Sequence, residues 1–171
     1  MSTAPPSPPA LPASRLIGAF VSGVGDLSVL RALHAAMPRT PICYIADSAY
    51  EPYGERPVAE VLARSSCITR HLLSLCSTGI VVACDTATAI AIEHFRTLWP
   101  NLPIVGIEPG LKRAIAATRN RRIGVMATPA TLASALFASL AASQADTTLV
   151  MHQLVQALLN RSRRAIWNRL K

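Results

Sequence analysis

The stretch IVVACDTAT, residues 80–88, combines a strand pattern with the start of a helix. It opens with an apolar run that ends at Cys84, which is typical of a strand buried on both faces of a sheet. Asp85, Thr86 and Thr88 follow at once, and these residue types are common where helices begin. The stretch therefore predicts a buried strand that passes directly into a helix, with a cysteine at the junction.

The same alternation of strand and helix recurs along the rest of the chain. Further apolar, β-branched runs occupy residues 16–21, 42–46, 104–107 and 123–127. Apolar residues at helical spacing occupy residues 27–37, 58–75 and 89–98. Alternating strands and helices predict an α/β fold: a single three-layer domain with a mainly parallel sheet of about five strands.

The two ends of the chain differ from this central domain. Residues 1–14 are rich in proline and predict a disordered leader. The α/β domain is expected over residues 15–145. Residues 146–171 are predicted to form a basic amphipathic tail, with one helix over 149–171 because Val150 and Leu154 fall on a common face.

The charge balance is basic, with a net charge of +8. Much of the excess lies in the tail, at Arg161, Arg163, Arg164, Arg169 and Lys171. Such a segment can bind nucleic acid or an anionic membrane surface. The alternative is a solvated tail, and the concentration of charge outside the domain favours it.

The sequence shows no feature of a secreted or membrane-spanning protein, which predicts a location inside the cell. No apolar run has the length of a membrane span, and the first residues lack the basic start of a secretory signal. The four cysteines show neither a C-x-x-C pair nor zinc-ligand spacing. We therefore expect a cytoplasmic protein with reduced thiols and no metal site.

Parallel strands bring the loops that follow them to one edge of the sheet, where ligands bind. Here those loops are residues 22–26, 47–55, 84–88, 108–110 and 128–131. The N–H groups at the start of a helix favour the thiolate form of a nearby cysteine, so the thiol of Cys84 is a candidate for catalysis. The alternative is that Cys84 is a small apolar residue that merely finishes a strand.

Together these loops resemble those of the glutamate racemase family. The residues that carry the resemblance are VSGVGD at 21–26, ADSAYEPYG at 46–54, ACDTAT at 83–88, VGIEP at 105–109 and IGVMATPAT at 123–131. Their order and spacing agree from about residue 16 to residue 134. The resemblance implies that the domain is equivalent to the amino-terminal lobe of a two-lobe racemase.

The resemblance also implies an activity, namely cofactor-independent interconversion of L- and D-glutamate, which supplies D-glutamate for peptidoglycan. Cys84 matches the first of two catalytic cysteines in that family. The positions that match substrate-holding residues are Ser22, Tyr53, Gly54, Asp85 and Thr86. A glutamate ligand without cofactor or metal is therefore expected.

Three residues depart from the family pattern. Val21 stands where the family has an aspartate that assists the cysteine. Asp85 replaces an asparagine, so its charge is expected to repel a dicarboxylate and to disfavour the thiolate. Asp26 replaces a glycine and adds a further negative charge to the first loop.

The second family cysteine belongs to a carboxyl-terminal lobe, and this sequence has no cysteine after Cys84. The expectation is a truncated, impaired racemase. Two alternatives remain open: a non-catalytic half-domain that binds a ligand or partner, and a homodimer that pairs two Cys84 side chains across one substrate.

Overall fold

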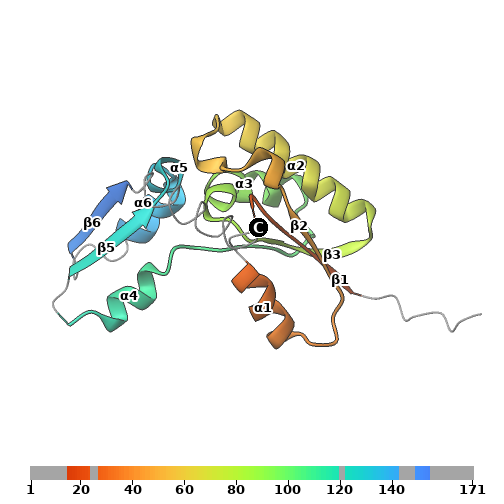
Figure 1. Ribbon diagram of the computed structural model, residues 1–171, viewed down its shortest axis with the longest axis horizontal. Helices are drawn as coiled ribbons and strands as arrows, with labels where there is room; N and C mark the ends of the chain where they lie inside the picture. The colour runs from red at the N-terminus through yellow and green to blue at the C-terminus, as the bar shows by residue number, and fades with distance from the viewer. Residues whose placement is uncertain (1–14, 24–26, 120–121, 143–148, 155–171) are drawn as a thin grey trace, which may run out of the picture.

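The computed structural model describes residues 15–23, 27–119, 122–142 and 149–154. Strands and helices alternate along these residues (Figure 1). The strands are β1 (Leu16–Val21), β2 (Ile42–Ala46), β3 (Ser77–Val82), β4 (Ile104–Gly106), β5 (Arg122–Ala127) and β6 (Leu149–Leu154). The helices are α1 (Leu27–Ala36), η2 (Ser48–Tyr50), η3 (Tyr53–Glu55), α2 (Val58–Ser74), α3 (Asp85–Leu98), α4 (Leu111–Ala117), α5 (Pro129–Leu132) and α6 (Ala135–Ala142).

The main sheet has four parallel strands in the order β2-β1-β3-β4. Helices α2 and α3 cover one face of this sheet, and α1 lies against the other (Figure 1). The predicted α/β fold, with a mainly parallel sheet between helical layers, is confirmed.

The core holds the two central strands in register. Phe20 of β1 pairs with Val82 of β3, and both side chains are fully buried. Leu72 of α2 and Phe95 of α3 complete the same apolar cluster and are also fully buried. Each such side chain contributes about 1.5–3 kcal/mol by leaving water, so the alignment of β1 with β3 is strongly favoured.

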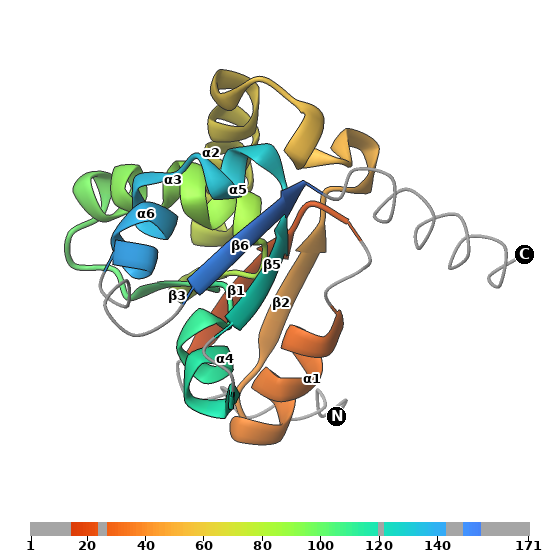
Figure 2. The same ribbon diagram turned by 90° about the vertical axis from the view of Figure 1, so that its left-hand side faces the viewer.

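The fifth predicted strand does not join this sheet. Instead β5 pairs with β6 in a separate two-stranded parallel sheet, which Figure 2 shows in front of the main sheet. The residues of β5 alternate between exposed and half-buried, whereas a strand buried on both faces had been expected. Because neighbouring residues of a strand point to opposite faces, the half-buried residues of β5 all lie on one side of this small sheet.

The predicted helix over residues 149–171 is wrong at its start, because residues 149–154 form β6. The run LVMHQL suits either structure when judged by spacing alone. Pairing along the whole length of β5 satisfies the backbone groups of β6 and decides between them. The predictions for residues 1–14, 146–148 and 155–171 lie outside the described residues.

In the described part of the chain, no helix combines the length and the apolar character that crossing a bilayer requires.

Candidate active site

The sulfur of Cys84 meets the loop that follows β1. Cys84 lies two residues beyond the end of β3, in an extended conformation, and is the residue from which α3 begins. Its backbone carbonyl accepts a hydrogen bond from the Thr88 N–H, at 2.8 Å. Its thiol lies beside the end of the neighbouring strand β1, where Sγ donates to Ser22 Oγ at 3.6 Å.

Cys84 is 5% exposed, so it is buried, yet it lies among the loops that the sequence predicted. Ser22 follows β1 directly and is half-buried. Because β1 and β3 are adjacent and parallel, these two residues emerge side by side. The structure thus brings together two of the predicted site residues that are distant in sequence.

Tyr53 lies in the turn that follows β2 and is 1% exposed. Its hydroxyl donates a 2.7 Å hydrogen bond to Asp47 Oδ2. Burial raises the pKa of Tyr53, and its contact with Asp47 and the nearby Cys84 raise it further. The phenol therefore stays protonated, and its proton is committed to Asp47.

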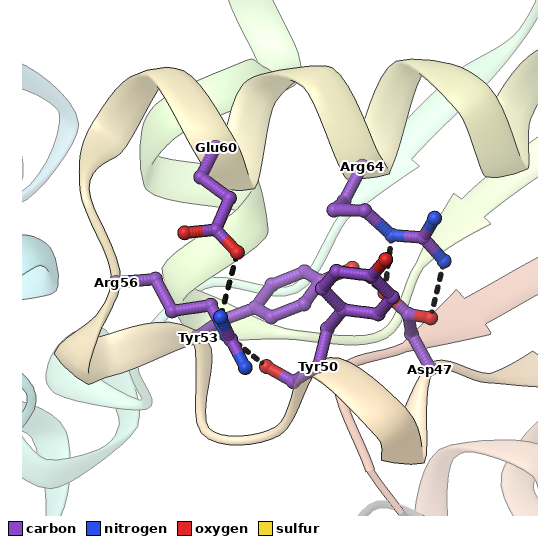
Figure 3. A network of polar contacts seen from close by, with 6 residues as sticks. All are labelled: Asp47, Tyr50, Tyr53, Arg56, Glu60 and Arg64. Carbon is purple, nitrogen blue, oxygen red and sulfur yellow. Dashed lines mark hydrogen bonds and ion pairs between the residues drawn. The ribbon is translucent and has the colours of Figure 1, made fainter.

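A network of polar contacts links this turn to α2 (Figure 3). Arg64 of α2 donates two hydrogen bonds to the Asp47 carboxylate, from Nε to Oδ2 at 3.1 Å and from Nη2 to Oδ1 at 2.7 Å. The same guanidinium lies over the Tyr50 ring, 3.8 Å from its centroid. Arg56 donates to the Tyr50 carbonyl and to Glu60 Oε1. Residues of α2 thus fix the loop at several points.

Asp47 remains charged despite its position. Burial alone would raise the pKa of its carboxyl group, but the hydrogen bonds from Arg64 and Tyr53 outweigh burial and hold the pKa below its usual value. The bond to Asp47 in turn raises the pKa of Arg64 above its ordinary value. Both groups are therefore ionised at neutral pH, and their bidentate geometry is rigid.

A third loop, the one that follows β5, contacts the first turn of α3. Thr86, in the first turn of α3, shares a 3.1 Å hydrogen bond with the hydroxyl of Thr128. Thr128 follows β5 and also caps α5 by accepting from the Thr131 N–H. A methyl group added at Gly54 would lie 2.5 Å from Thr128 Cγ2. Gly54 and Thr86, both predicted site residues, are therefore joined through Thr128.

Thr128 was not among the predicted site residues. Its loop was expected at the ligand-binding edge, but nothing in the sequence distinguished its hydroxyl from those of its neighbours.

The three residues that depart from the family pattern lie in different places. Val21 is 1% exposed and belongs to the core, and Asp85 is exposed in the first turn of α3, where the helix dipole favours a carboxylate. Asp26 lies outside the described residues.

Within residues 15–23, 27–119, 122–142 and 149–154, no three His, Cys, Asp or Glu side chains gather as metal ligands would. The chemistry that the site offers is that of a thiol, hydroxyl groups and backbone N–H groups.

Replacement of Arg64 by alanine should destabilise the fold, because it leaves the buried Asp47 charge with one partner fewer. We expect the free energy of unfolding to fall by about 1–3 kcal/mol, less than for a fully buried pair since the Arg64 side chain is 29% exposed. Arg96→Ala is the matched control: its pair with Glu93 is exposed and should contribute less than about 0.5 kcal/mol. Equal losses in urea unfolding would contradict the assigned role of Arg64.

Asp47 also predicts how stability depends on pH. Its pKa is lower in the folded protein than the ordinary value of 3.8, so the unfolded chain binds the proton more readily. The stabilisation is therefore complete above that ordinary pKa and is lost as the pH falls through the folded value. Asp47→Asn should lower the free energy of unfolding at neutral pH. On acidification that free energy should then fall less in the variant than in the unaltered chain, and urea titrations across this acid range measure both effects. An unchanged decline in the variant would refute the prediction.

Comparison with known proteins supports one family. No protein-family model matches the chain. The glutamate racemase of Ectopseudomonas mendocina is 48% identical over 124 residues, which cover 72% of this chain and 47% of that relative. The chain thus spans about half the length of the relatives that it matches.

Solved structures agree. The glutamate racemase of Aquifex pyrophilus superposes with a TM-score of 0.71 at 36% identity, over 84% of this chain and 57% of that one. The Escherichia coli glutamate racemase, solved in complex with L-glutamate and the activator UDP-MurNAc-Ala, gives a TM-score of 0.77 at 27% identity, over 86% and 55% of the two chains. Over the residues matched, the chain belongs to the glutamate racemase family.

Proposed function

We propose that this chain carries the first proton-transfer site of a glutamate racemase-type protein. In this reaction the Cys84 thiolate removes the Cα proton of glutamate without a cofactor, and return of a proton to the opposite face gives the other enantiomer. The product, D-glutamate, would serve peptidoglycan synthesis in the cytoplasm. The observation that carries the proposal is the contact between Cys84 Sγ and Ser22 Oγ at the edge where the Tyr53 turn also lies.

The groups around the thiol suit an amino acid with two carboxylates. The Tyr53–Gly54 turn offers backbone N–H groups, while Ser22 and Thr86 offer hydroxyls. N–H and O–H groups that converge on a carboxylate form charge-assisted hydrogen bonds, which are stronger than neutral ones. The E. coli relative solved with L-glutamate supports the choice of this substrate class.

Racemisation needs an acid–base group on each face of Cα. Among the cysteines of this chain, only Cys84 follows a strand at the ligand-binding edge. Cys43 lies within β2, Cys67 is exposed on α2, and Cys76 is exposed at the turn between α2 and β3. We therefore propose that Cys84 serves one face only, and that Val21 and Asp85 weaken its activity by the missing acid and the added charge.

The proposal predicts a half-reaction that can be isolated in deuterium oxide. One enantiomer of glutamate should exchange its Cα hydrogen for deuterium faster than in buffer alone, because Cys84 can remove and return a proton on one face. Net racemisation should be much slower than this exchange. Proton NMR measures the exchange, and chiral chromatography measures the enantiomers.

Cys84→Ser should lower the exchange rate by about 100-fold or more, the usual contribution of a positioned acid–base group. Cys67→Ser is the matched control and should keep the full rate, because that thiol is exposed on α2. Exchange that persists in Cys84→Ser, or its absence with both enantiomers in the unaltered chain, would refute the proposal. Racemisation that rises with the square of protein concentration would show that a second copy supplies the other face.

A further inference from the structure

Glu51 lies against the loop that touches the catalytic sulfur. It is half-buried in the segment between β2 and η3. A methyl group built on Gly23 would lie 2.2 Å from its Oε2 and 2.6 Å from its Oε1. Contacts that short mean that the carboxylate of Glu51 packs directly on the backbone at Gly23, in space that any larger residue would occupy.

The position of this charge follows from the sheet. Val21 of β1 pairs with Ala46 of β2, so the loops that follow these two strands run side by side. Gly23 is the residue after Ser22, whose hydroxyl is 3.6 Å from the Cys84 sulfur. The carboxylate of Glu51 therefore borders the side of the site on which Ser22 lies, whereas Thr86 and Gly54 meet at Thr128.

This arrangement gives the two parts of the site opposite preferences. The part made by Gly54 and Thr86 presents N–H and O–H groups, which favour carboxylates. The part beside Gly23 carries a carboxylate, which favours a cation. An α-amino acid has both kinds of group on the carbon that reacts, so its α-ammonium group matches the charge of Glu51.

We propose, on the basis of the proposed function, that Glu51 is a specificity-determining residue that binds the α-ammonium group of the substrate. Val21, where the family resemblance leads one to expect an acid, is part of the apolar core. Glu51 supplies a carboxylate from the neighbouring loop instead. It orients the amino acid so that the carboxylates point toward Gly54 and Thr86.

The first test measures charge selection at Cys84 and does not depend on glutamate. Cationic 2-aminoethyl and anionic 2-sulfonatoethyl methanethiosulfonate both modify thiols, and peptide mass spectrometry reports the rate at Cys84 alone. Glu51→Gln should lower the cation-to-anion rate ratio at least about threefold, because it removes one negative charge from the border of the site. Glu93→Gln, the same change on the exposed face of α3, should leave the ratio unchanged.

The second test compares glutamate with glutarate, which has the same two carboxylates but no amino group. Calorimetry on the full chain should show glutamate binding weakened at least fivefold by Glu51→Gln, with glutarate binding unchanged or tighter. An unaltered labelling ratio in Glu51→Gln overturns the proposal, as does glutamate binding of undiminished affinity. A Glu51-dependent labelling ratio in a chain that binds neither ligand supports the charge selection and refutes the proposed function.

Discussion

The parallel pairing of β1 with β3 is the constraint on which the site depends. Phe20 and Val82 are partners in this pairing and are fully buried, so neither strand can slide without exposing the core. Because a shift of one residue would turn every side chain to the other face, the register is strongly fixed. Ser22 and Cys84 therefore leave the sheet together, and the contact between hydroxyl and thiol follows from the way the core packs.

The loops that face Cys84 are positioned by different means. A buried charge on Asp47, held by Arg64 and by the Tyr53 hydroxyl, fixes the turn that follows β2. Hydroxyl contacts of Thr128 fix the loop that follows β5 against α3. Buried charge and hydroxyl networks are directional, whereas apolar packing is not. The polar network thus adds to the sheet the geometric definition that proton transfer at one carbon requires.

Much of this arrangement could be predicted from sequence, and the rest depends on contacts that spacing does not reveal. The strands of the main sheet and helices α1, α2 and α3 appear as apolar periodicity, and the loops after β1, β2 and β3 were correctly expected to meet. The segment over 149–154 was misassigned because its apolar residues fit a helix as well as a strand, and only pairing with β5 decides. The hydrogen bonds between Arg64 and Asp47 join residues 17 positions apart, so no local sequence pattern indicates them. Glu51 carries no sequence signal either, since its meaning comes from packing against Gly23.

The thiol of Cys84 and the loops around it are proposed to form one ligand site for an amino acid. The most direct measurement is the change in backbone amide resonances when glutamate is added to the isotope-labelled chain. Perturbations should concentrate at Ser22, at the Tyr53–Gly54 turn and at Thr86, with none over the exposed face of α2. Perturbations confined to surfaces away from Cys84 would contradict it, as would a spectrum that does not respond to either enantiomer.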